Sequence, residues 1–441
     1  MRQKRFIIFF LGIFFLAFVG RAEVLGVYKT KSGVGWLERS EQGDLILHLE
    51  GSWYDMGYEQ GKLLKKECLI TLNSVKGLLR SYLPFASFKL TKKLLYKTVY
   101  KREEPYIPEE FKQELKGLAD ALEIRIEDLQ ALHAMIFIAS CSGASAFGRA
   151  TKDGELYQTR SLDYPLTFID PKTKTPLQNQ SLIVVYKPKG GIPFISFSWP
   201  GFIGSVGGMN VKGICVSEMT DASWYERPAG LPMIFRIKQT LAKAKNLDQA
   251  IKLMTQKPLE GGYNFLVGDG KIPSAVAIEM NAKRAYVGSW NSPAESNSYW
   301  NWLKKYEYKP LEGLIVRTNH PLSKEIIKYY PIPIWLGRNS TGWRYFDLRK
   351  RLEREYGNLD MVRMMEIMRQ HYQGMCSPPD YKGCSPTMYQ AVFAPAKGDF
   401  LIAFAHGNPR KQGTYKTSAY NQPYHRYNIF GLIKAKPESK N

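Results

Sequence analysis

The chain has 441 residues, of which 44% are hydrophobic and 13% aromatic, and its formal net charge at pH 7 is +22. This apolar content suffices for a sizeable core and excludes an intrinsically disordered protein. The length corresponds to one large or two ordinary domains. The lysines are scattered along the chain, and no nucleic-acid-binding motif accompanies them. We therefore expect no nucleic-acid partner, and a basic surface that associates with anionic envelope material.

Residues 1–22 have the pattern of a signal peptide. Arg2, Lys4 and Arg5 precede an apolar stretch over residues 6–19, and a Gly-Arg-Ala tripeptide follows it. The apolar stretch is short for a membrane-spanning helix, which needs roughly 20 residues. We expect export to the periplasm, the envelope or the extracellular space with cleavage after residue 22. An uncleaved anchor is the alternative.

The remaining chain is predicted to form one domain from two segments. Residues 23–140, mostly helical, form a propeptide or small subunit, and residues 141–441 form the catalytic region. In the first segment, a polar lead precedes a strand at 44–49, a mostly helical basic region follows to about residue 104, and helices are expected at 109–122 and 126–139. The second segment is rich in strands, which are expected at 181–186, 194–198, 214–217, 263–268, 275–280, 389–394 and 400–405. Two further helices are expected to start at N-cap residues Asn246 and Asn358.

Cys141 is the candidate nucleophile, because it stands between the helix 126–139 and a strand of small residues, 142–148. A Lys-Asp-Gly turn leads to a return strand with Arg160 and Asp163, and we expect both side chains to project into the region of the thiol. If the bond between Ser140 and Cys141 is cut, the new α-amino group, with a pKa of about 7.7–8.0, can accept the proton of a thiol with a pKa of about 8.5. One residue then supplies both nucleophile and base.

In this hypothesis Arg160 favours the thiolate, and Asp163 orients the amine or balances the arginine. The alternative is an inert, half-buried cysteine beside an ordinary surface Arg–Asp pair.

The chain contains five cysteines, an odd number for an exported protein. Cys376 and Cys384 flank a stretch rich in Pro and Gly and are the expected disulfide. Cys141 then remains free, and Cys215, in an apolar strand, is expected to stay a buried thiol. No phosphate-binding loop, dinucleotide fingerprint, HExxH or paired CxxC is present, and the histidines have no metal-ligand spacing. We therefore expect no cofactor and no metal.

A series of short motifs follows Gly51 in a distinctive order. They are GSWYDMGYEQGKLL from residue 51, Cys141 with small residues after it, RSLD at 160–163, GGMNVKGICVSE at 207–218, GGYNFLVGDG at 261–270, VRTNHP at 316–321 and MYQAVFAPAKGDFLIAFAHG at 388–407. In this order and with these intervals, the chain resembles the acyl-coenzyme A:isopenicillin N acyltransferase-like family. That family is related to the choloylglycine hydrolases and penicillin V acylases, all of which are N-terminal-nucleophile hydrolases.

The resemblance implies an α+β fold of four layers, αββα, with two packed antiparallel sheets. It also implies self-cleavage before Cys141, attack of the thiol on a linear amide of a small N-acyl compound, and a thioester intermediate. Asn319 would donate a hydrogen bond to the oxyanion. Glu218 and Asn264 are weaker candidates for contact with the substrate. Relatives often have an asparagine where this chain has residues 217–220, so the second oxyanion donor is unassigned.

Three functions remain open from the sequence. The leading one is an exported, self-processing cysteine amidase or acyltransferase, because hydrolysis and acyl transfer share the thioester. The second is an ester or phospholipid deacylase like the phospholipase B-like proteins. The third is a non-catalytic envelope-binding protein in which Cys141 is inert.

Self-cleavage is directly testable on the purified protein. We expect the active protein to contain one chain that begins at Cys141 and a shorter chain that ends at Ser140 and stays bound to it. Cys141→Ala gives a single uncut, inactive chain, whereas Cys141→Ser is processed slowly. Intact-mass analysis and N-terminal sequencing of the purified protein measure this. An active protein that consists of one intact chain contradicts the hypothesis.

Overall fold

The computed structural model describes residues 22–82, 87–134, 140–301, 304–332, 334, 340–376 and 384–437. The export segment expected at residues 1–22 therefore lies almost entirely outside the described residues, and so does the end of the helix expected at 126–139. Among the helices that are described, none is both long and apolar enough to span a membrane.

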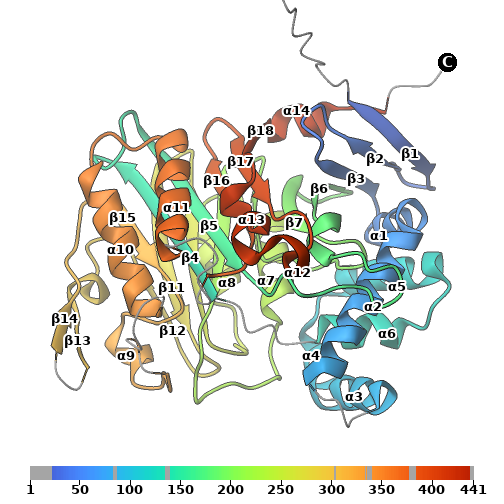
Figure 1. Ribbon diagram of the computed structural model, residues 1–441, viewed down its shortest axis with the longest axis horizontal. Coiled ribbons are helices and arrows are strands. Elements are labelled where there is room, and N and C mark those ends of the chain that lie inside the picture. Colours follow the sequence, from blue (N-terminus) through green and yellow to red (C-terminus); the bar gives the residue numbers. More distant parts are fainter. Residues whose placement is uncertain are drawn as a thin grey trace, which may run out of the picture.

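Two large sheets face each other at the centre of the molecule, and helices cover their outer sides (Figure 1). Within the described residues the larger sheet has ten strands, listed here in spatial order: β1 (Glu23–Lys29), β2 (Val34–Arg39), β3 (Leu45–Gly51), β6 (Leu182–Pro188), β7 (Phe194–Ser198), β8 (Gly207–Asn210), β9 (Ile214–Thr220), β10 (Tyr263–Asp269), β11 (Ser274–Met280) and β12 (Ala285–Gly288). The other large sheet has six: β15 (Leu314–Arg317), β4 (Ser140–Gly148), β5 (Gly154–Asp163), β16 (Thr387–Ala394), β17 (Asp399–Phe404) and β18 (His425–Asn428). A separate hairpin joins β13 (Ser298–Asn301) to β14 (Lys304–Glu307).

The core lies in the layers between these elements. Between the sheets, Phe197 of the larger sheet contacts the rings of Tyr389, Phe393 and Phe400 of the smaller one. The outer helices are α1 (Trp53–Leu63), α5 (Glu109–Leu122), α7 (Met233–Lys243) and α8 (Leu247–Met254) on the larger sheet, and α10 (Thr341–Arg354) and α11 (Met361–Met375) on the smaller. The remaining longer helices are α2 (Lys65–Tyr82), α3 (Phe88–Leu95), α6 (Ile126–His133) and α14 (Ile429–Lys434). The four-layer αββα arrangement predicted from the resemblance is confirmed.

The two segments on either side of Cys141 share one sheet. Strand β3 from the first segment pairs in parallel with β6 from the second, so the larger sheet is complete only when both segments are present. The first segment is helical from Trp53 to His133, but the polar lead expected at 23–43 is wrong, because β1 and β2 form there. The alternate residues of β1 are exposed, as an edge strand permits, and they include the apolar Leu25 and Val27, so a strand signal was present in this stretch.

Predicted element positions agree closely with the structure where local signals are strong. Helix α5 and strand β7 match their predicted bounds, and Asn246 caps α8 by accepting from the main-chain N–H of Gln249. The predicted cap at Asn358 is wrong: Asp360 caps α11 and accepts from the N–H of Arg363. Leu359 instead forms an isolated β-bridge with Thr151, which keeps the preceding backbone extended and moves the helix start by two residues.

A buried ion pair joins the two segments. Lys238 of α7 donates from Nζ to both carboxylate oxygens of Glu114 of α5, at 2.7 and 2.6 Å, and to the main-chain oxygen of Ile203. Both side chains are fully buried, and the ring of Tyr186 lies 4.2 Å from the ammonium. Burial lowers the pKa of Lys238 to about 8 and raises that of Glu114 to about 7. Water is thus excluded from both charged groups, and each charge is stabilised by its partner.

Removal of one partner should therefore be much more costly than removal of both. We expect Lys238→Met to destabilise the fold by about 3–5 kcal/mol, because an uncompensated carboxylate stays buried, and Glu114→Leu in the same chain to restore much of the loss. The matched control is Lys243→Met, which breaks an exposed pair between the same two helices, Lys243 with Glu110, worth about 0–1 kcal/mol. Urea unfolding followed by fluorescence measures all three, and equal stability of Lys238→Met and wild type contradicts the expectation.

Candidate active site around Cys141

Cys141 lies near the start of β4, in the layer between the two sheets. It pairs with Leu162 across β5, and its side chain is fully buried. Burial raises the pKa of the thiol to about 12, although the positive charge of Arg160 opposes this rise. In the uncleaved chain the sulfur is therefore protonated at neutral pH. A thiol in this state is a weak nucleophile, and a base that accepts its proton would activate it for turnover of substrate.

The guanidinium of Arg160 connects the thiol to the opposite sheet. Its Nη2 lies 4.0 Å from the sulfur of Cys141 and donates to Oε2 of Glu218 at 3.0 Å. Its Nε donates to the hydroxyl of Tyr389 at 2.7 Å. Arg160 and Glu218 come from β5 and β9 and are both buried, so this ion pair bridges the two sheets beside the nucleophile. Burial raises the pKa of Glu218, and Arg160 opposes that rise.

Asp163 does not share this region, contrary to the sequence prediction. Side chains alternate between the two faces of a strand, so residues three positions apart point to opposite faces. Asp163 accordingly faces the helix layer, where it accepts hydrogen bonds from Ser161, Tyr372 and Thr387 at 3.1, 2.7 and 2.8 Å. Burial raises its pKa, and these hydroxyls, together with the charge of Arg344, oppose the rise. The Asp163 charge still acts on the thiol, whose pKa it raises.

Asn319 holds the nitrogen of the bond that is expected to break. Its Oδ1 accepts from the main-chain N–H of Cys141 at 2.7 Å. Its Nδ2 donates to the main-chain oxygen of Thr220 at 2.5 Å, which ties β9 to the same side chain. In the uncleaved chain Asn319 thus positions the scissile peptide between the two sheets. The proposed oxyanion role concerns a substrate complex and stays a prediction.

Buried side chains from two neighbouring strands hold the loop that contains Asn319. Asn264 of β10 donates from Nδ2 to the main-chain oxygens of Thr318 and His320, both at 2.9 Å. Glu279 of β11 accepts from the main-chain N–H groups of residues 322 and 323. Asn264 thus contacts the loop backbone, so its geometry fits a positioning role rather than the substrate contact considered from the sequence.

Arg344 of α10 was not identified from the sequence, yet it contacts three groups at the site. Its Nη1 donates to the main-chain oxygen of Cys141 and to the hydroxyl of Ser142, and its Nη2 donates to Oδ1 of Asn319 at 2.7 Å. An arginine in a basic amphipathic helix looks like a solvated residue. Only burial among these acceptors distinguishes Arg344 from its neighbours, and burial is a tertiary property.

The only histidine adjacent to these residues in sequence is unsuited to act as the base. The ring nitrogens of His320 contact the hydroxyls of Tyr308, Thr318 and Thr341, and burial lowers its pKa to about 3. His320 is therefore not the base for the thiol. Among the described residues, no group of three or more His, Cys, Asp or Glu side chains is arranged to hold a metal ion.

A largely apolar pocket adjoins the cluster. It encloses about 950 Å³, part of it open to solvent, and Leu162, Glu218 and Thr220 form the wall nearest to Cys141. Apolar and aromatic side chains such as Phe168 and Phe202 form most of the remaining wall. The pocket is composite, since helices α2, α4 (Lys101–Glu103) and α6 of the first segment supply part of its lining. Its apolar character suits an acyl chain.

The sequence of the chain matches the model of a known protein family. Residues 169–410, more than half of the chain, match the model of a family described as acyl-coenzyme A:6-aminopenicillanic acid acyl-transferase. The chain belongs to this family. Glu218, Asn319 and Arg344 lie inside the matched region, whereas Cys141 and Arg160 precede it. The resemblance expected from the sequence motifs is confirmed, and the protein is a member of an enzyme family.

Curated relatives extend the similarity beyond the matched region. An uncharacterized protein of Archaeoglobus fulgidus is 26% identical over 400 residues, which is 82% of this chain and 63% of that protein. Protein dcd1B of Dictyostelium discoideum is 26% identical over 264 residues, 54% of this chain and 50% of that protein. The chain thus spans between half and two thirds of the length of these relatives.

Two solved structures are also similar to the chain. The N-acylethanolamine-hydrolyzing acid amidase ortholog of Caenorhabditis elegans aligns with a TM-score of 0.40 and 16% identity, covering 65% of this chain and 99% of that one. Penicillin V acylase from Agrobacterium tumefaciens aligns with a TM-score of 0.41 and 11% identity, covering 65% and 91%.

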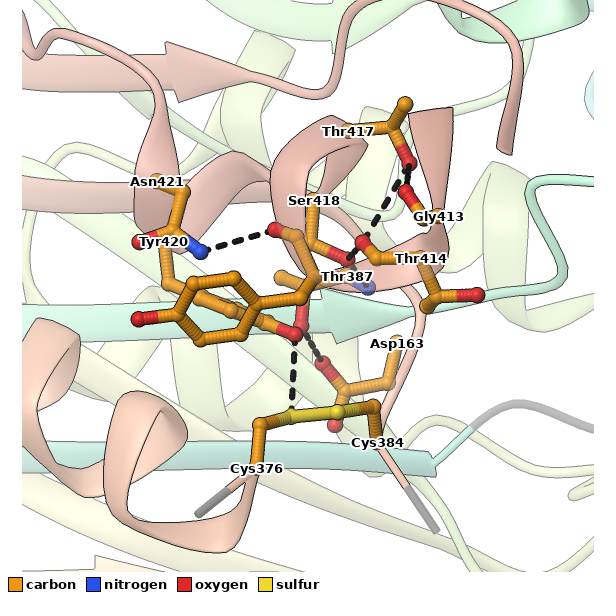
Figure 2. Close-up of a disulfide and its surroundings, with 11 residues drawn as sticks. Asp163, Cys376, Cys384, Thr387, Gly413, Thr414, Thr417, Ser418, Tyr420 and Asn421 are labelled. Carbon is orange, nitrogen blue, oxygen red and sulfur yellow. Dashed lines mark hydrogen bonds between the residues drawn. A yellow bond between two sulfur atoms is a disulfide. The ribbon is translucent and has the colours of Figure 1, made fainter. Parts of the chain in front are cut away.

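In this family member the predicted disulfide between Cys376 and Cys384 is present, with Cα atoms 4.8 Å apart, while Cys68, Cys141 and Cys215 are unpaired. Figure 2 shows the disulfide together with Asp163, Thr387 and Tyr420. The sulfur of Cys376 lies 3.1 Å from the hydroxyl of Tyr420. The crosslink therefore stands at the end of α11, close to the hydroxyl groups that surround Asp163.

The two functions of the Asn319 amide can be separated by substitution. Asn319→Asp keeps the oxygen that accepts from Cys141 but loses the N–H donor, so we expect cleavage before Cys141 to persist while turnover of substrate falls roughly 10²–10³-fold. Asn319→Ala loses both groups and should impair both steps. Chain cleavage is followed by mass spectrometry and turnover by product release. Wild-type turnover in Asn319→Asp contradicts a donor role for Asn319.

Proposed function

We propose that this protein is a self-cleaving cysteine amidase or acyltransferase that transfers the acyl group of a small N-acyl compound through a thioester on Cys141. The observation that carries the proposal is the buried thiol beside Arg160, behind a wall of a mainly apolar pocket that is formed by Leu162, the strand partner of Cys141, and Glu218, the partner of Arg160. Family membership supports the reaction class. The same proposal includes export, with residues 1–22 as the signal, and continued association of the cleaved segments.

Self-cleavage begins with the thiol of Cys141 and the carbonyl of Ser140. The sulfur attacks the carbonyl carbon, the S–C bond forms, and the C–N bond breaks as the nitrogen of Cys141 takes the thiol proton. Water then hydrolyses the thioester, which leaves a carboxylate on Ser140, a free thiol and a free amine on Cys141. The hydrogen bond from the Cys141 N–H to Asn319 and the contact of Arg344 with the Cys141 carbonyl hold this peptide in place.

The amine of Cys141 is the base for the catalytic cycle. It accepts the thiol proton, and the thiolate attacks the amide carbonyl of the substrate while Asn319 donates to the oxyanion. The protonated amine then gives its proton to the leaving nitrogen, so the amine product departs and the acyl group stays on sulfur. Water, or a second amine in acyl transfer, attacks the thioester with its proton taken by the same base.

Arg160 alone stabilises the thiolate only weakly, because the carboxylate of Glu218 balances the charge of its guanidinium. Once the newly formed amine has accepted the thiol proton, its positive charge attracts the thiolate. The Arg160–Glu218 ion pair, which has no net charge, does not supply this attraction. The uncleaved chain lacks this amine and keeps a protonated thiol, so cleavage and activation of the nucleophile coincide.

Formation of the acyl-enzyme tests the proposal. We expect wild-type protein incubated with an N-acyl amide to gain the mass of the acyl group on the peptide that begins at Cys141, and hydroxylamine to remove it. Cys141→Ala shows neither cleavage nor labelling. The matched control is Cys215→Ala, which removes another buried thiol and should retain both. Acyl release without any acylated Cys141 contradicts the mechanism.

An ester or phospholipid deacylase is the second candidate, because an apolar pocket binds an acyl chain whether its link is an amide or an ester. Amide and ester substrates with the same acyl chain and the same leaving skeleton distinguish the two. We expect the amide to be cleaved at a rate comparable to the ester, although amides are intrinsically less reactive. Cleavage of the ester alone assigns the protein to the second candidate.

A further inference from the structure

A pair of carboxyl groups lies in the wall of the apolar pocket. Glu103 ends the short helix α4 (Lys101–Glu103) of the first segment, and Glu260 precedes β10 of the second. The two side chains are 3% and 9% exposed, and their carboxyl groups are hydrogen bonded to each other. The mechanism described above uses neither of them.

One oxygen of this pair has no hydrogen-bond donor among the described residues. Glu260 lines the pocket together with Met233, the first residue of α7. Its Oε2 is buried and has no hydrogen-bond partner among the described residues. Buried polar atoms are nearly always hydrogen bonded, so an unpartnered carboxylate oxygen in a pocket wall indicates a ligand that donates.

The surroundings favour a donor that is positively charged. The charged side chains in the described wall of the pocket are Glu103, Glu218 and Glu260, all of them acidic. Glu218 is already paired with Arg160. His133 also lines the pocket, but burial lowers its pKa to about 4, so it carries no charge at neutral pH.

The nearest cation to the pair is engaged elsewhere. Arg236 of α7 acts on Glu260 through space, while its guanidinium donates to the main-chain oxygens of residues 231, 253, 254, 256 and 258. Two other titratable groups interact electrostatically with Glu260. The exposed Glu226 raises the pKa of Glu260, and Glu260 raises the pKa of Tyr263. Burial raises the pKa of both carboxyls; the contact with Glu260 raises the pKa of Glu103 further, to about 10, whereas the contact with Glu103 lowers that of Glu260. The pair therefore holds a proton at neutral pH.

We propose that the Glu103–Glu260 pair is a subsite for a primary ammonium group at the end of an apolar chain, and that it selects N-acyl substrates that carry such a group. The subsite rests on the proposed function for its role in selection, but not for binding itself. The ammonium donates to Oε2 of Glu260 and to Glu103, and it replaces the proton that the two carboxyls share. The chain between the ammonium and the amide occupies the apolar part of the pocket.

Since Glu103 and Glu260 lie in different segments, the subsite needs both. A catalytic chain that had lost residues 23–140 would lack Glu103 and much of the pocket wall. Retention of the first segment after cleavage is therefore a requirement for this selectivity.

Binding of three probes to the wild-type protein tests the subsite without relying on catalysis. Octylammonium, octanol and octanoate have the same chain and differ in the end group. By isothermal titration calorimetry we expect octylammonium to bind at least about tenfold more tightly than octanol, and octanoate to bind most weakly. Equal affinities, or a preference for octanoate, overturn the proposal.

The pH dependence gives a second readout that needs no variant. A proton and an ammonium compete for the pair, so octylammonium affinity should rise as pH increases from mildly acidic to mildly alkaline, while the ligand stays charged below its own pKa of about 10. Octanol affinity should stay constant over the same range. A flat profile for octylammonium overturns the proposal.

Variants then assign the site. Glu260→Gln and Glu103→Gln should each abolish the preference for octylammonium over octanol, and the matched control Glu226→Gln, which changes an exposed nearby carboxylate, should leave it intact. A preference that survives both pocket variants overturns the assignment. If either variant fails to fold, the probe and pH series on wild type decide the question.

Amide substrates locate the ammonium within the substrate. One substrate carries it at the end of the acyl chain, a second at the end of the amine portion, and two isosteric alkyl amides lack it. We expect one of the cationic amides to have a kcat/KM at least about tenfold above its neutral isostere. Equal values for both pairs overturn selection by the subsite, whereas absence of all amide cleavage contradicts the proposed function and leaves the probe-binding result to decide the subsite.

Discussion

The ion pair between Arg160 and Glu218 is the interaction on which the site depends. It spans the space between the two sheets, where an unpaired charge would be very costly to bury, so each partner requires the other. The pair keeps a guanidinium 4.0 Å from the sulfur of Cys141 without leaving a net charge beside it. A protonated thiol is therefore stable in the uncleaved chain, and an added positive charge at Cys141 would change that balance.

The two faces of the strands β4 and β5 contact different parts of the molecule. Toward the opposite sheet they present the thiol and Arg160, next to the pocket. Toward α10 and α11 they present Ser142 and Asp163, which are held by Arg344 and Tyr372. The second face holds the strand ends in a dense set of hydrogen bonds. The position of the scissile peptide is thus set from the helix side, while the chemistry faces the sheets.

The segment before Cys141 is part of the same structure and not a detachable leader. It supplies three strands of the larger sheet, and the buried pair of Glu114 with Lys238 ties its helices to α7. It also completes the pocket. A cut between Ser140 and Cys141 would therefore change the covalent chain but leave the interfaces that join the two parts.

The sequence alone determined much of this protein because several of its signals are local. Strand patterns such as 194–198, the cap at Asn246 and the position of Cys141 after a helix depend on neighbours in the chain. The order of short motifs identified the family resemblance and the four-layer fold. Cys376 and Cys384, separated by a short loop, were also predictable as a disulfide.

Only the tertiary structure decided which of the candidate residues meet. Arg160 reaches the thiol and Asp163 does not, since strand alternation sends residues three apart to opposite faces. Arg344 belongs to the site because α10 packs over β4, a contact between residues about 200 positions apart that no local pattern contains. Strands β1 and β2 carry an apolar strand pattern of their own, which the sequence prediction did not use. The pairing of Glu103 with Glu260 likewise depends on folding, which brings two distant carboxyls into one apolar wall where neither could be buried alone.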